Sequence, residues 1–196
     1  MKIIARIMFV SALLFSSAHS AEAIQTLNEF EVGDQAKWSC AKSIAVTLFP
    51  AAGEFKADKD LQHYQVDFAK KLASGLKKMP GVEQVEIVDD KSAASADVLI
   101  LGQFTELTKG NGALRFWVGL GAGKSSCGVD MKGVDLKSES EIFRLDHARR
   151  SAMEVVGDDV LIKNMDEVVE DVIAGLAAAK GACGSGPAPE NSTGAN

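Results

Sequence analysis

The segment of the sequence most suggestive of binding chemistry alternates two kinds of residue between positions 115 and 123. Arg115 and Trp117 are followed, at the same two-residue step, by Gly119, Gly121 and Gly123. In an extended strand these five residues share one face, because successive side chains point to opposite sides. That face combines a cation, an aromatic ring and a strip without side chains, which a partner backbone, a peptide or an apolar ligand could approach closely. We name these five residues the Arg-Trp-Gly strip and predict that they form a binding surface.

The glycines of the strip also allow a purely structural interpretation. Glycine lets a strongly bent strand pass close beneath another part of the same protein. In that case the strip would pack internally and bind nothing. The sequence leaves both interpretations open.

The same segment does not match a nucleotide-binding loop. The phosphate-binding pattern G-x-x-x-x-G-K-[ST] requires glycine at position 118, where this chain has Val118. The G-x-G-x-x-G pattern fails as well, because Lys124 stands where its third glycine should be. We therefore predict no nucleotide site and no cofactor.

Residues that could support catalysis are few and scattered. After residue 23 the only histidines are His63 and His147, and neither has carboxylates or cysteines at metal-ligand spacing, so we predict no metal site. Asp146 and His147 should point to opposite faces of a strand, and we expect His147 at the surface. No G-x-S-x-G motif is present. These observations favour a protein that is not an enzyme; the alternative is a small hydrolase in which Asp146, His147 or Ser151 meets Asp97 in the folded chain.

The first 23 residues are typical of a secretory signal peptide. Two positive charges in Met1–Arg6 precede an apolar run over Ile7–Phe15, and small residues follow. We predict cleavage after Ala23, with cleavage after Ser20 as the alternative. The apolar run is well short of the roughly 20 residues that span a bilayer, and the first cysteine is Cys40, so the lipid-attachment cysteine of a lipoprotein is absent. The mature chain is expected in the bacterial periplasm without a permanent membrane anchor.

Composition narrows the class of protein further. The 196 residues are 46% hydrophobic and 24% charged, which fits one soluble domain rather than a disordered chain. The formal net charge is −6, with 21 basic and 27 acidic side chains. An acidic chain lacks the excess of positive charge that draws proteins to nucleic acids, so we predict no nucleic-acid partner.

The spacing of apolar residues predicts the elements that position the strip. Strands are expected at Ser43–Phe49, Val82–Val88, Ala96–Thr108, Leu114–Leu136 and Glu141–Val155. An amphipathic helix is expected at Asp60–Met79, and a second helix should begin with Asn164 as its cap and stop at Lys180-Gly181.

This order, β-α-β-β-β-β-α, predicts an α/β sandwich, a mixed sheet with two main helices packed on one face. Residues 24–42 are expected to be an extended lead-in, residues 43–181 one domain, and residues 182–196, rich in Gly, Pro, Ser and Asn, a disordered tail.

Three cysteines, Cys40, Cys127 and Cys183, cannot all pair within one molecule, and their spacing matches no CxxC motif. A last helix antiparallel to its neighbouring strand would bring Cys183 to the start of the first strand. We therefore predict a Cys40–Cys183 disulfide, with Cys127 in a strand interior.

Three segments together resemble a known family: Ile44-Ala45-Val46, Ala96-Asp97-Val98-Leu99-Ile100-Leu101-Gly102, and the stretch from Gly112 to Lys124 that contains the strip. Over about Ser43 to Ala179 the chain resembles the bacterial envelope family catalogued as domain of unknown function 4410. The resemblance implies a small periplasmic α/β domain of the kind that acts as an adaptor, and it implies no reaction.

We therefore predict a non-catalytic periplasmic binding or adaptor domain of the cell envelope, which binds an envelope protein or peptide through the strip. Besides the hydrolase, a second alternative is a carrier of an apolar small molecule, which would need a cavity. The oligomeric state stays open.

Overall fold

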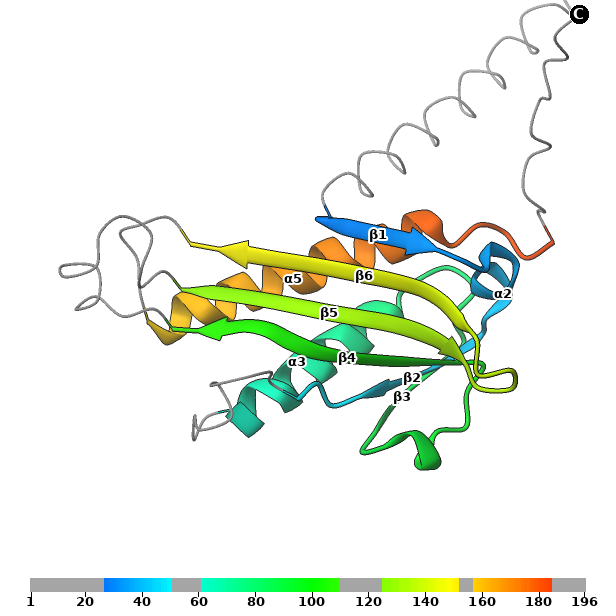
Figure 1. Ribbon diagram of the computed structural model, residues 1–196, viewed down its shortest axis with the longest axis horizontal. Helices are drawn as coiled ribbons and strands as arrows, with labels where there is room; N and C mark the ends of the chain where they lie inside the picture. Colours follow the sequence, from blue (N-terminus) through cyan, green and yellow to red (C-terminus); the bar gives the residue numbers. More distant parts are fainter. Residues whose placement is uncertain (1–26, 51–60, 110–124, 152–156, 185–196) are drawn as a thin grey trace, which may run out of the picture.

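The computed structural model describes residues 27–50, 61–109, 125–151 and 157–184. Within these ranges the chain forms a six-stranded sheet with two long helices packed behind it (Figure 1). The strands are β1 (Glu29–Val32), β2 (Ser43–Thr47), β3 (Gln84–Val88), β4 (Val98–Thr108), β5 (Ser126–Asp135) and β6 (Glu141–Arg150). The helices are α2 (Gln35–Cys40), α3 (Leu61–Leu76) and α5 (Asp158–Ala179), with a short 3₁₀ turn at Lys91–Ala93.

The sheet is mixed, as the sequence predicts, in the order β1-β6-β5-β4-β2-β3. Strands β2 and β3 are parallel and joined through α3, and β2 is also parallel to β4. From β4 onward the pairing is antiparallel, through β5 and β6 to the edge strand β1. The long, directly paired strands β4 and β5 therefore lie at the centre of the sheet. In sequence, the segment that carries the Arg-Trp-Gly strip connects β4 to β5.

The core lies between the sheet and the two helices. Helix α3 buries Phe68, Leu72 and Leu76, which follow the helical spacing that the sequence shows. Phe68 packs against Phe104 of β4 with ring centroids 5.1 Å apart, and each fully buried large side chain contributes about 1.5–3 kcal/mol. Gly81, with φ +75°, ends the turn that follows α3, as the Pro80-Gly81 pair predicts.

Residues 24–42, for which an extended lead-in was expected, contain two regular elements in their described part. Strand β1 pairs antiparallel with β6 and forms an edge of the sheet. Helix α2 begins at Asp34, whose carboxylate accepts a hydrogen bond from the Lys37 N–H at 3.0 Å. Because Trp38 of α2 is fully buried, the folded domain begins before residue 43.

The cap of the last helix lies seven residues earlier than predicted. This N-cap is Gly157, with φ +130°, and Asp158 and Asp159 occupy the first turn, where negative charge suits the helix dipole. Asn164 is not a cap but a buried residue inside the helix. Its side-chain amide finds its partner in the sheet, a contact that local sequence does not reveal.

Among the described helices, none combines the length and the apolar character that crossing a membrane requires.

Candidate functional site

The Arg-Trp-Gly strip, Arg115, Trp117, Gly119, Gly121 and Gly123, lies outside the described residues. The chain on both sides of it is described. Lys109 directly follows β4, and Ser125 directly precedes β5. These two residues mark where the segment containing the strip leaves the sheet and returns to it.

Both flanking residues are attached to α5. Lys109 places its ammonium 2.9 Å from the Asp158 carboxylate, and its carbonyl accepts a hydrogen bond from the Gly157 N–H at 2.9 Å. Tyr64 of α3 also donates to Asp158, at 3.1 Å. Hydrogen bonds from Lys109 and Tyr64 lower the pKa of Asp158. The start of α5 is thus attached to the end of β4.

The return point is held by Asn164. Its side-chain Nδ2 donates to the Ser125 carbonyl at 3.1 Å and lies 3.3 Å from the Ser125 hydroxyl. The Ser151 N–H donates to the same carbonyl at 2.9 Å. Both Ser125 and Asn164 are buried, so these hydrogen bonds satisfy groups that water does not reach.

His147 is buried, not at the surface as predicted, with 1% of its area exposed. It lies on the face of β6 that the helices cover, and its Nε2 is 2.8 Å from the Asp171 carboxylate of α5. Arg149, two residues along the same face, donates to Asp171 at 2.6 Å. Burial opposes ionisation of Asp171, but the hydrogen bonds from Arg149 and His147 lower its pKa. The sequence predicts the strand that contains His147, but it does not reveal that Asp171 of α5 is the partner of this histidine.

We name Ser125, His147, Asn164 and Asp171 the N-terminal anchor of α5, because they attach this helix to the sheet at Asn164 and Asp171, on the N-terminal side of the disulfide. Next to it lies Cys127, the free cysteine among the described residues, buried in β5 as predicted. Burial raises the pKa of its thiol to about 12. Such a thiol stays protonated at neutral pH and is a poor nucleophile.

The residues of the hydrolase alternative are not brought together. Asp97 accepts hydrogen bonds from the Lys42 and Ser43 N–H groups at 3.0 and 3.1 Å, at the start of β4. His147 lies further along the sheet, opposite Val129. Asp146 lies on the other face of β6, where burial and the nearby carboxylates raise its pKa.

The Ser151 hydroxyl donates a hydrogen bond to the Ser125 carbonyl at 3.2 Å. The acceptor of this hydrogen bond is therefore a backbone carbonyl and not His147. Within the described ranges, no cluster of three or more His, Cys, Asp or Glu side chains is arranged to hold a metal ion.

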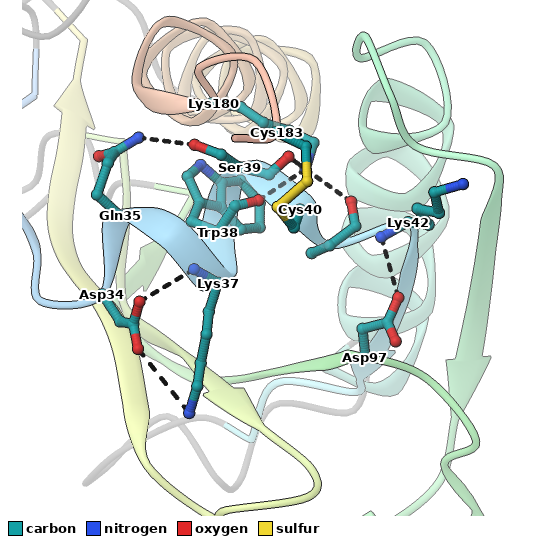
Figure 2. The surroundings of a disulfide bond; sticks show 11 residues. Asp34, Gln35, Lys37, Trp38, Ser39, Cys40, Lys42, Asp97, Lys180 and Cys183 are labelled. Carbon is teal, nitrogen blue, oxygen red and sulfur yellow. Dashed lines mark hydrogen bonds and ion pairs between the residues drawn. A yellow bond between two sulfur atoms is a disulfide. The ribbon is translucent and has the colours of Figure 1, made fainter. Parts of the chain in front are cut away.

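Just beyond the C-terminal end of α5, a disulfide joins Cys183 to Cys40, the pair that the sequence predicts. It joins α2 to the segment that follows α5, 143 positions further along the chain (Figure 2). Trp38 lies beside it and donates its indole N–H to the Leu176 carbonyl at 3.1 Å. The disulfide and the tryptophan therefore attach α2 and α5 to each other.

Lys180 completes this end of the molecule. The sequence predicts that the helix stops at Lys180-Gly181, and the helix ends there. The Lys180 side chain is buried, and its ammonium donates to backbone carbonyls of α2 and of the residue after it. The acceptors are the carbonyls of Trp38 (2.7 Å), Ser39 (3.3 Å) and Ala41 (2.7 Å). These carbonyls lie at the C-terminus of α2, where helical carbonyls lack their usual partners, although the Trp38 carbonyl also accepts from the Ala41 N–H at 3.3 Å.

The ammonium also lies 4.9 Å from the centroid of the Trp38 ring. Burial lowers the pKa of Lys180. We name Trp38, Cys40, Lys180 and Cys183 the C-terminal anchor of α5.

Between the two anchors, the outer surface of the helix layer is hollowed into a groove of about 620 Å³, which lies between α3 and α5. Its lining is mainly apolar or small: Ser74, Gly75, Met79, Pro80, Val169, Ile173, Ala174 and Ala177, with Lys70, Lys71, Lys78 and Glu170 around them. Gly75 is required here, because a Cβ at this position would lie 2.6 Å from Ile173. The groove is large enough to receive a small ligand or a segment of a partner.

Sequence reasoning did not identify the groove. Helical spacing separates the buried side of each helix from the exposed side, but it does not tell which helices lie side by side. The one available signal was the presence of small residues, Ser74-Gly75 and Ala174, on the outward sides of two amphipathic helices.

A family model described as "Domain of unknown function (DUF4410)" matches residues 18–157. The chain belongs to this family. The match includes the strip and all six strands but ends before α5, whereas the resemblance noted from the sequence extends to Ala179. Among curated proteins, none matches the sequence.

Solved structures with a similar fold include the PelC dodecamer from Paraburkholderia phytofirmans, at 16% identity and a TM-score of 0.48. The alignment covers 73% of this chain and 94% of PelC. Lipoprotein GNA1162 from Neisseria meningitidis is similar at 11% identity and a TM-score of 0.41, over 66% of this chain and 96% of the lipoprotein. Neither similarity assigns a function to the chain.

Proposed function

We propose that this protein is a non-catalytic binding domain of the bacterial cell envelope, which acts in the periplasm after its signal peptide is removed. The observation that carries the proposal is the α3–α5 groove. Its floor of small and apolar side chains leaves apolar surface exposed on the outside of the helix layer, where a ligand or partner segment can bury it.

Binding at the groove can be tested with a photo-crosslinking amino acid in the living bacterium. Ala174 is exposed and lines the groove, so a crosslinker at position 174 should form a discrete adduct. Lys132, exposed on the sheet face that the helices leave uncovered, provides the matched control position. An adduct from position 174 that is absent from position 132 supports the proposal. No adduct, or the same adduct from both positions, contradicts it.

The Arg-Trp-Gly strip is a second candidate surface of the same binding domain. Its flanking residues support it, because Lys109 and Ser125, which precede and follow the segment in sequence, are both attached to α5. A Trp117→Ala, Arg115→Glu double variant that folds is expected to lose a pull-down partner from the periplasm. Retention of every partner of the parent protein would remove the strip from consideration as the binding surface.

A further inference from the structure

The α3–α5 groove is lined by unequal numbers of charges of each sign, although the protein as a whole is acidic. Three lysines, Lys70, Lys71 and Lys78, lie along its α3 side, against one acid, Glu170, on α5. Lys71 is neutralised by ion pairs with Asp166 across the groove and with Asp67 one turn earlier on its own helix. Lys70 and Lys78 are exposed and form no ion pair with any residue in the described part of the chain.

The arrangement of the helices gives the groove a direction. Helices α3 and α5 run in the same direction, since Lys71 meets Asp166 and, further along both helices, Gly75 approaches Ile173. The ion pair crosses the groove near its beginning, and Pro80 and Ala177 line its far end. A floor of small side chains flanked by unpaired lysines has a shape that suits a slender apolar chain with a negatively charged end.

We propose that the groove binds a single-chain anionic amphiphile, a long-chain carboxylate. The acyl chain lies along the floor over Gly75, Ile173 and Ala174, and the carboxylate lies beside Lys70 or Lys78. Burial of methylene groups supplies affinity that is independent of charge, and the lysines select the anion through charge-assisted hydrogen bonds. This inference rests on the proposed function, because it names the ligand class of the same groove.

The test uses the mature chain with its disulfide intact and dodecanoate as the probe, followed by titration calorimetry below the micelle concentration. Dodecyltrimethylammonium has the same chain with the opposite charge and serves as the matched probe. Dodecanoate is expected to bind about tenfold or more tightly than the cation at low salt, and the difference is expected to shrink as salt is added. Equal affinity for the two probes would overturn the inference.

Two variants locate the site. The Lys70→Glu, Lys78→Glu double variant is expected to bind dodecanoate about tenfold or more weakly. Lys77→Glu, Lys132→Glu makes the same change of net charge at exposed lysines that do not line the groove, and it should bind as the parent does. If both double variants lose affinity equally, net charge rather than the groove sets binding, and the inference fails.

A variant that fills the floor of the groove distinguishes dodecanoate binding in the groove from binding elsewhere on the protein. Ala174→Trp fills the groove from an exposed position and should abolish dodecanoate binding without unfolding the protein, which circular dichroism checks. Unchanged binding in this variant would place the amphiphile outside the groove.

The crosslinking experiment keeps the two proposals distinguishable. If position 174 captures a protein segment and dodecanoate does not bind, the groove is a binding site but the ligand class proposed here is wrong. If neither occurs, both proposals fail.

Discussion

The two ends of helix α5 are attached to the rest of the protein by different chemistry. The C-terminal anchor joins the helix to α2 through a covalent bond and a buried ammonium that satisfies three backbone carbonyls. The N-terminal anchor joins it to β5 and β6 through one side-chain amide and one carboxylate. The first attachment depends on the redox state of Cys40 and Cys183, and the second on the ionisation of Asp171.

Helix α5 is therefore held covalently at its C-terminal end and only by hydrogen bonds and charge pairs at the N-terminal anchor. Ser125 and Lys109, which follow and precede the Arg-Trp-Gly strip in sequence, are attached to α5 toward its N-terminal end. A helix fixed covalently at one end can shift at the other without losing its place on the sheet. The following predictions test whether the two anchors are as unequal as their contacts indicate.

Removal of the disulfide should have the largest effect. In the double variant Cys40→Ser, Cys183→Ser, the unfolded chain regains the freedom of a loop that closes over 143 positions, so the free energy of unfolding should fall by about 3–5 kcal/mol. Urea denaturation without reductant measures the difference. Parent protein treated with reductant should match the variant.

The same comparison can be made with two truncated chains. A chain ending at Gly184 keeps Cys183 and should melt close to the parent, whereas a chain ending at Gly181 should melt clearly lower under oxidising conditions. Equal melting temperatures for the two truncations would show that the disulfide contributes little.

Replacement of Lys180 by methionine should have the next largest effect. The change preserves an apolar stem but leaves the carbonyls of Trp38, Ser39 and Ala41 without their shared donor, at a cost of about 2–4 kcal/mol. Lys42→Met, at a lysine whose side chain is 66% exposed, is the matched control and should change stability by less than about 0.5 kcal/mol. Thermal melting of both variants, with the disulfide intact, measures the difference in stability between them. Similar melting temperatures would mean that the disulfide alone holds this end.

Asp171→Asn should destabilise the protein in a pH-dependent way. At pH 7 the variant loses the charged partner of His147 and Arg149, and we expect a loss of about 1–3 kcal/mol. Because the pKa of Asp171 is lowered in the folded state, its carboxylate stabilises the fold above the unfolded value of about 3.9. That contribution disappears as the pH falls through the folded pKa, so parent and variant should converge in acid.

Urea denaturation between pH 7 and pH 2.5 measures this convergence. Lys180→Met is the control, because it leaves Asp171 and its partners unchanged, so its deficit should not follow the titration of Asp171. A constant deficit for Asp171→Asn as well would show that the N-terminal anchor does not depend on ionisation.

Asn164→Ala should have the smallest effect of the four. It removes one donor to Ser125, whose carbonyl keeps the Ser151 N–H, so the loss should be about 1–2 kcal/mol. Lys163→Ala, on the exposed side of the same helix with 75% of its side chain accessible, is the matched control and should be nearly neutral. A loss for Asn164→Ala as large as that for Lys180→Met would make the two anchors equal.

Sequence alone determined the features that depend on local spacing. The stripe of Phe68, Leu72 and Leu76 predicts which side of α3 faces the sheet, and the observed side agrees. The element order predicts the parallel β2-α3-β3 unit and the hairpins after it, and through that topology the pairing of Cys40 with Cys183. The Arg-Trp-Gly strip stays a prediction.

Only the tertiary structure decided the environment of the polar residues. The sequence predicts His147 at the surface, Asn164 as a helix cap and Lys180 at the end of the last helix, and it does not predict that all three are buried. Their partners are distant in sequence: Asp171 lies 24 positions from His147, and the Trp38 carbonyl lies 142 positions from Lys180. Periodicity tells which side of an element is apolar, but a buried polar group is stable only where another element supplies its hydrogen bonds, and that element is placed by the packing of the whole chain.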